Sequence, residues 1–128
     1  MTAQSIIRWL PAVGQAALIF VLSAQADLRL APEPVLDFAL HKAGHLAVYG
    51  VLAWLVARAL EVPGRTSRVV MVGSLLLCIA YGATDELHQA LVPGRGPSPV
   101  DVAIDGLGAL LGLAAYRLVR RPGVDSGR

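Results

Sequence analysis

The sequence predicts an all-α integral membrane protein, a bundle of four transmembrane helices joined by short loops. Hydrophobic residues make up 55% of the 128 residues, charged residues make up 16%, and the mean hydropathy is +0.61. A soluble domain of this size needs more polar residues to cover its surface. The apolar residues also fall into four segments that approach the length required to cross a bilayer. We therefore predict one membrane domain, residues 1–128, rather than a soluble helical bundle, whose helices would be apolar on one side only.

The four apolar segments give the predicted helices and the connections between them. The helices are expected at residues 6–24, 43–60, 69–91 and 100–119, with a polar tail at 120–128. Residues 25–40 have mixed charge and predict a loop that ends in a short interfacial helix near residues 35–40. The first segment has two interpretations, because Arg8, an apolar run and Ala24-Gln25-Ala26 also fit a cleaved signal peptide. We favour a retained transmembrane helix.

Basic residues predict the orientation, since cytoplasmic loops carry an excess of Lys and Arg. With both termini cytoplasmic, the outer side holds Arg29, Lys42 and Arg95. The inner side then holds Arg8, Arg58, Arg65, Arg68, Arg117, Arg120, Arg121 and Arg128. Eight against three is a clear bias, so we expect cytoplasmic termini. The single cysteine, Cys78, excludes an intramolecular disulfide and fits a buried thiol.

In this topology the polar residues of the helices gather at the outer end of the bundle. Lys42, His45 and Tyr49 follow one another at steps of three and four, which places them on one helical face. The third helix ends with Asp85, Glu86 and Gln89. Ionisable residues inside membrane segments are costly, so such a cluster is a functional-site hypothesis.

The fourth helix carries a stripe of polar and small residues that runs inward from its outer end. Asp101, Asp105, Gly108 and Gly112 lie at intervals of three or four residues. The two glycines predict close approach of a neighbouring helix beside the aspartates. An imidazole one turn into the membrane needs a partner, and we expect Asp85 or Asp101 to pair with His45.

These residue types suggest roles in a site open to the outer surface. The candidate catalytic residues are His45, Asp85, Glu86 and Asp101. His45 would act as a base that the carboxylate of Asp85 or Asp101 orients, and Glu86 would be a second acid or base. The candidate ligand-binding residues are Lys42, Tyr49, Gln89, Arg95 and Asp105. Lysine and arginine bind phosphate or carboxylate oxygens. No reaction is assigned, no metal or cofactor is predicted, and the few aromatic residues argue against nucleic-acid binding.

The spacing of these residues resembles that of the VanZ-like family of small bacterial membrane proteins. The pattern is Ser23-x-Gln25, Lys42-x-x-His45-x-x-x-Tyr49, Asp85-Glu86-x-x-Gln89, Pro93-Gly94-Arg95 and Asp101-x-x-x-Asp105-x-x-Gly108-x-x-x-Gly112. It covers roughly residues 15–118. The family usually has Asp at the position of His41 and Asn at that of Asp105. This chain therefore lacks the acid next to Lys42 and has an acid at position 105 instead.

The resemblance implies a protein of the bacterial cell (inner) membrane that is linked to tolerance of the glycopeptide teicoplanin. Its site would bind, and in one version modify, a lipid or a lipid-linked cell-wall headgroup. Two alternatives stay open: a non-catalytic envelope scaffold that recruits a partner, and a proton-coupled transporter using His45, Asp101 and Asp105. A transporter needs polar residues through the whole bundle, and the inner half has few. Homo-oligomerisation is also open.

Overall fold

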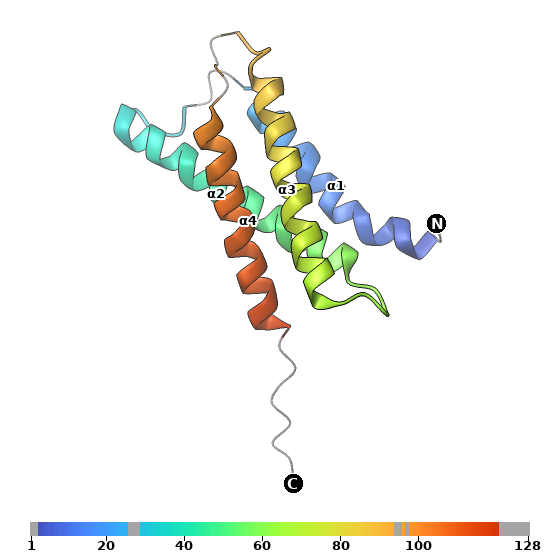
Figure 1. The fold of residues 1–128 in the computed structure, drawn as a ribbon. Coiled ribbons are helices and arrows are strands. Elements are labelled where there is room, and N and C mark those ends of the chain that lie inside the picture. Colours follow the sequence, from blue (N-terminus) through green and yellow to red (C-terminus); the bar gives the residue numbers. More distant parts are fainter. Residues whose placement is uncertain (1–2, 26–28, 94–95, 97, 121–128) are drawn as a thin grey trace.

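The computed structural model consists of four α-helices and describes residues 3–25, 29–93, 96 and 98–120. The helices are α1 (Ala3–Ser23), α2 (Pro34–Leu60), α3 (Ser67–Gln89) and α4 (Pro99–Val119). They alternate in direction, so that α2 and α4 run parallel and α3 runs antiparallel to both (Figure 1). The prediction of an all-α bundle is confirmed.

All four helices are long and apolar enough to cross a membrane. Their outward surfaces carry large apolar side chains, among them Leu76 on α3 and Leu111 on α4. A soluble bundle would direct these residues inward, whereas a bilayer solvates them. The protein is therefore a multi-pass membrane protein.

The second helix begins earlier than the sequence analysis predicted. Helix α2 starts at Pro34 rather than at residue 43, so the predicted interfacial helix is its first part. Glu33 caps the helix by accepting a hydrogen bond from the Leu36 N–H at 2.7 Å, and Pro34 occupies the first turn, where no N–H is needed. Glu33 and Pro34, which the sequence analysis placed in the loop, are thus helix-start signals, whereas the described residues 29–33 are non-helical as predicted. The other helices differ from prediction by no more than three residues at either end.

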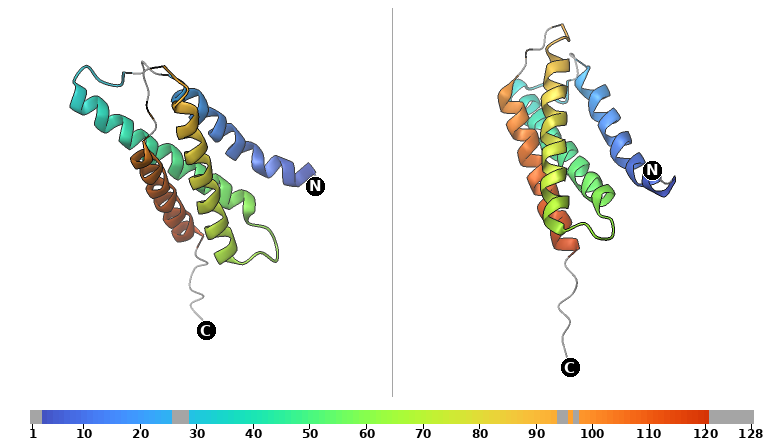
Figure 2. Two further views of the ribbon diagram at one scale, coloured as in Figure 1. Left: turned by 45° about the horizontal axis from the view of Figure 1, so that its top comes forward. Right: turned by 45° about the vertical axis from the view of Figure 1, so that its right-hand side comes forward.

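Helices α2, α3 and α4 form the core, and α1 lies on its outer side. Helix α1 contacts α2 along its length and α3 only slightly, and no contact between α1 and α4 is found in the described residues. Both views in Figure 2 show α1 (blue) diverging from α3 and α4 toward its beginning, while its first turns stay near the end of α2. Its attachment includes hydrogen bonds from Gln15 Nε2 to the Val48 carbonyl (3.1 Å) and from Tyr81 Oη to the Ala16 carbonyl (2.6 Å).

The closest helix pair is α2 with α4, and glycines make this approach possible. A Cβ atom on Gly108 would lie 2.5 Å from the Leu46 carbonyl oxygen, and one on Gly112 would overlap the carbonyl oxygen of Gly50. Only glycine leaves room for these backbones, which is how small residues act in membrane helix packing. The predicted role of Gly108 and Gly112 is confirmed.

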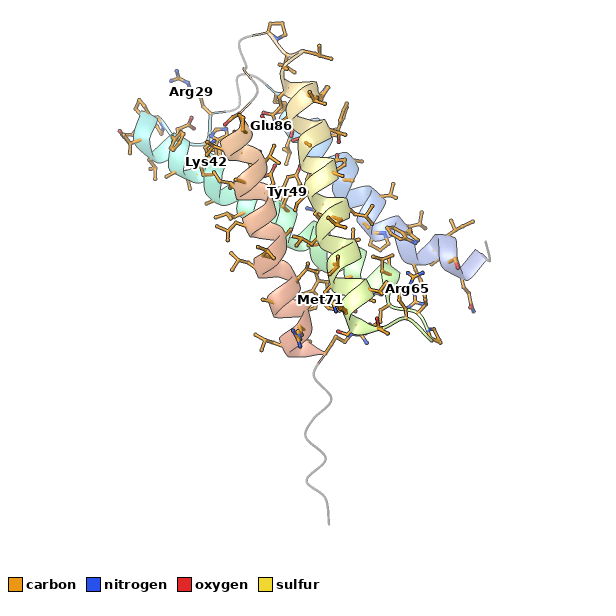
Figure 3. The ribbon with its side chains drawn as sticks, viewed as in Figure 1. Arg29, Lys42, Tyr49, Arg65, Met71 and Glu86 are labelled. Atoms are coloured by element: carbon orange, nitrogen blue, oxygen red, sulfur yellow. The ribbon has the colours of Figure 1, made fainter. Side chains whose placement is uncertain are left out.

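The bundle has two polar ends with different chemistry. The acidic end carries Asp85, Glu86, Asp101 and Asp105 and lies where α1 and α3 finish and α4 begins. The arginine end carries Arg8, Arg65, Arg117 and Arg120 and lies where α2 finishes and α3 begins. Figure 3 shows Lys42 and Glu86 near the acidic end and Arg65 at the opposite end.

We predict that Gly112→Ala lowers the free energy of unfolding by about 2 kcal/mol, because the added methyl group forces α2 and α4 apart. The measurement is SDS-induced unfolding in mixed micelles. Gly14→Ala is the matched control, since a Cβ there has no atom within 4 Å. Equal stability of the two variants would contradict the glycine-dependent packing.

Candidate functional site

The acidic end brings together polar side chains from all four helices. Helix α2 contributes Lys42 and His45, α3 contributes Asp85, Glu86 and Gln89, and α4 contributes Asp101 and Asp105. Helix α1 adds Ser23 at its last residue. Because α2 and α4 run parallel at close range, their polar residues face each other in sequence order.

Lys42 and Asp101 form an ion pair across α2 and α4. The Lys42 ammonium group donates a hydrogen bond to Asp101 Oδ1. Both side chains are largely buried, with 26% and 14% of their surfaces exposed. The Lys42 ammonium group also lies 5.0 Å from the centre of the Phe38 ring. Pairing lowers the cost of placing either charge at the margin of a membrane segment.

His45 pairs with Asp105, one turn deeper. Its Nδ1 lies 2.8 Å from Asp105 Oδ1, and the Asp105 side chain is only 1% exposed. This corrects the prediction that Asp85 or Asp101 would be its partner. The reason is the register of the helices, which sets Asp101 beside Lys42 and Asp105 beside His45. Asp105 is therefore the hydrogen-bond partner of His45.

Asp85 belongs to a separate buried network between α1 and α3. Its Oδ2 accepts hydrogen bonds from Ser23 Oγ at 2.6 Å and from Gln89 Nε2 at 3.0 Å. Asp85 and Gln89 are 3% and 2% exposed. This network fastens the end of α1 to α3, which is a structural task that sequence reasoning did not assign to Ser23.

Glu86 and Tyr49 are also buried. Glu86 Oε2 accepts a hydrogen bond from the backbone N–H of Ser98 at 2.6 Å, which fixes the start of α4 against α3. Tyr49 lies beneath His45, with nearly parallel rings whose centres are 6.4 Å apart. Several buried oxygens here have no hydrogen-bond partner among the described residues: Tyr49 Oη, Asp85 Oδ1, Glu86 Oε1 and Asp105 Oδ2.

A polar cavity of about 320 Å³ opens beside the Lys42–Asp101 pair. Its wall includes Arg29, Asp37, His41, Lys42 and His45. Arg29 reaches this wall because Asp37 Oδ1 accepts hydrogen bonds from the backbone N–H groups of residues 30 and 31, at 2.6 and 3.0 Å. Sequence reasoning missed Arg29 and Asp37 as site residues. The signal was Asp37 in the first turn of α2, because a carboxylate there can accept hydrogen bonds from the backbone of the preceding loop.

An apolar cavity of about 190 Å³ adjoins the polar one, between α1 and α2. Its wall is formed by Ile19, Leu22, Ser23, Gln25, Leu30, His41, Gly44, His45 and Val48. His41 and His45 line both cavities. A charged compartment and a hydrocarbon-lined compartment therefore meet at two imidazole rings. Together the two cavities match the polar and apolar parts of an amphipathic molecule.

The structure divides the predicted site residues into two groups. Lys42, His45 and Asp101 line the polar cavity, and Asp105 stands directly behind His45. The others, Tyr49, Asp85, Glu86 and Gln89, are buried side chains that line neither cavity. Arg95 lies outside the described residues.

The groups at the polar cavity supply cations, an imidazole and carboxylates. Arg29 and Lys42 can donate hydrogen bonds to phosphate or carboxylate oxygens. The His45–Asp105 pair has the geometry of a base held by an orienting acid. In the described residues, no group of three or more His, Cys, Asp or Glu side chains is placed to hold a metal ion.

We predict strong energetic coupling between His45 and Asp105. In a double-mutant cycle of His45→Ala and Asp105→Asn, the coupling free energy is expected to be about 2 kcal/mol, because the two groups are in direct contact. Unfolding of the single and double variants by SDS in mixed micelles measures it. In the control cycle, His41→Ala replaces His45→Ala and the coupling stays within about 0.5 kcal/mol. Additive His45 and Asp105 effects would contradict the pairing.

Comparison with known proteins gives the family. Searches among curated proteins and among solved structures returned no match. The sequence model described as VanZ/LLP1 matches residues 3–120, a range that contains all four helices. The family resemblance read from the polar motifs is thereby confirmed. The chain belongs to the VanZ/LLP1 family.

Proposed function

We propose that the protein binds a lipid with a phosphate-bearing headgroup at its acidic end, with the headgroup in the polar cavity and a hydrocarbon chain in the apolar one. The observation that carries this proposal is the junction of the two cavities at His41 and His45. A soluble polar ligand would have no use for the apolar compartment. A purely apolar ligand would make no use of the hydrogen-bonding and charged groups of the polar compartment.

Arg29 and Lys42 provide the contacts for phosphate oxygens. The Arg29 guanidinium group can bind two oxygens at once, and Lys42 acts as a point charge. Asp101 holds Lys42 in the cavity wall, and Asp37 holds the backbone next to Arg29. The cations are thus in position before a ligand arrives, which reduces the entropy lost on binding.

The apolar compartment is suited to a lipid chain because it lies between two membrane-spanning helices. Gly44 forms part of its wall, and a Cβ atom there would meet nothing within 4 Å. Phospholipids and lipid-linked cell-wall precursors both combine a phosphate headgroup with long hydrocarbon chains. The family's association with glycopeptide tolerance favours the second class as the physiological ligand.

The His45–Asp105 pair extends the proposal from binding to modification of the bound headgroup. In that version His45 takes a proton from a nucleophile at the headgroup, and Asp105 stabilises the resulting imidazolium. No bond change is assigned. A mass change in the bound lipid would distinguish modification from binding alone.

The test of the proposed site is lipid retention by the purified protein, measured by native mass spectrometry. The probes are phosphatidylglycerol, phosphatidylethanolamine and undecaprenyl phosphate added in detergent. Arg29→Gln is expected to weaken binding about tenfold, which corresponds to about 1.4 kcal/mol, because one phosphate contact is lost. Gly44→Leu is expected to remove one bound lipid by filling the apolar cavity.

Two matched variants serve as controls for this test. Arg68→Gln removes an exposed arginine at the far end of α3, and Gly14→Leu adds a side chain on α1 where nothing lies within 4 Å of the new Cβ. Both are expected to bind as the parent does. Equal retention by all four variants would reject the site and leave the polar network as a scaffold. Lipid binding that changes only with the proton gradient in vesicles would favour a transporter.

Orientation is the second part of the proposal, because the acidic end must face the outer leaflet. We predict that Pro32→Cys in a Cys78→Ala background reacts with a membrane-impermeant maleimide in intact cells. Pro63→Cys, at the arginine end, is expected to react only after lysis. Both prolines are exposed in the structure, so accessibility depends on the membrane side alone. The reverse labelling pattern would place the acidic end in the cytoplasm.

A further inference from the structure

The arginine end has a second polar cavity, which no predicted site residue touches. Its volume is about 390 Å³ and its wall includes Glu61, Arg65, Arg117 and Arg120. It lies at the opposite end of the bundle from Lys42, as the position of Arg65 in Figure 3 shows. Three arginines against one glutamate give this wall an excess of positive charge.

Only one of the three arginines is neutralised within the described residues. Arg120 Nη2 lies 3.2 Å from Glu61 Oε2, and its guanidinium group lies 5.6 Å from the centre of the Tyr116 ring. Glu61 Oε2 also accepts a hydrogen bond from Tyr116 Oη at 2.5 Å, which holds the carboxylate in place. The Glu61 carboxylate is therefore already paired with Arg120 and Tyr116.

Arg65 and Arg117 are the remaining cations of this cavity. Arg65 Nη1 donates a hydrogen bond to the Leu60 carbonyl at 2.9 Å, which orients the side chain without cancelling its charge. Arg117 has neither a hydrogen bond nor an ion pair with any described residue. Both side chains are exposed, so they are accessible to a ligand at the membrane surface.

An apolar groove of about 520 Å³ continues from this cavity along α3 and α4. Met71 and Arg117 belong to both walls. The groove then runs between Leu75, Leu110 and Ala114, on the surface that faces the bilayer. A basic pocket at a membrane surface that opens into a lipid-facing groove is the arrangement that binds anionic lipid headgroups.

We infer that the arginine end holds an anionic phospholipid, with its phosphate between Arg65 and Arg117 and one acyl chain in the groove between α3 and α4. The inference is independent of the proposed function, since the two sites share no residue. The charge of the cavity selects an anionic over a zwitterionic headgroup. The groove selects a lipid over a soluble phosphate.

The experiment is a native mass spectrometry titration with phosphatidylglycerol, phosphatidylethanolamine and soluble glycerol phosphate. Arg65→Gln/Arg117→Gln is expected to weaken phosphatidylglycerol binding about thirtyfold, because two surface charges are lost. Ala114→Phe is expected to weaken it too, by blocking the groove. The matched controls are Arg68→Gln and Ala115→Phe, at exposed positions that do not line the cavity or the groove.

The possible outcomes separate this inference from the proposal for the acidic end. The inference is supported if the Arg65→Gln/Arg117→Gln and Ala114→Phe variants each lose one bound phosphatidylglycerol. The same loss is expected when the acidic end also carries Arg29→Gln and Gly44→Leu, so this result does not depend on binding at the acidic end. Unchanged binding in those variants overturns it. Equal binding of phosphatidylethanolamine, or of glycerol phosphate, overturns the assignment of an anionic lipid. Because the substituted residues at the arginine end and their two control positions are exposed, unchanged melting curves are expected for these variants and confirm that they are folded.

Discussion

The close parallel packing of α2 against α4 determines the rest of the structure. Gly50, Gly108 and Gly112 bring the two backbones into contact, and no larger residue fits there without moving the helices. This contact fixes the register in which Lys42 meets Asp101 and His45 meets Asp105. In a membrane, unpaired charges are costly, so the ion pairs depend on the glycine contact as much as on their own chemistry.

The polar residues of the acidic end serve two different purposes. Asp85 and Glu86 fasten helices: one binds Ser23 of α1, and the other binds the backbone at Ser98 before α4. Lys42 and His45 face cavities instead, and each is paired with an aspartate of α4. The ionisable residues of the acidic end therefore do not form a single site. The buried residues Asp85 and Glu86 hold the helices together, whereas Lys42 and His45 are accessible to a ligand in the cavities.

Much of this arrangement could be predicted from the sequence because it follows from membrane physics. Segment length and apolarity gave four helices, and the spacing of Asp101, Asp105, Gly108 and Gly112 placed them on one face of α4. The partner of His45 was predicted wrongly, because the register between two helices depends on contacts such as Gly112 against Gly50, which no single segment contains. Arg29 was missed for a similar reason. It joins the site only because Asp37 binds the backbone of the preceding loop.

The most direct test of the lipid site uses the three histidines as reporters. His41 and His45 line both cavities, whereas His88 stacks on Phe20 with ring centres 4.2 Å apart and lines neither. Side-chain 15N NMR of histidine-labelled protein in micelles would follow all three rings during a titration with undecaprenyl phosphate. We predict saturable shifts of the His41 and His45 signals and an unchanged His88 signal. Equal shifts of all three signals, or none, would contradict a lipid bound at the acidic end.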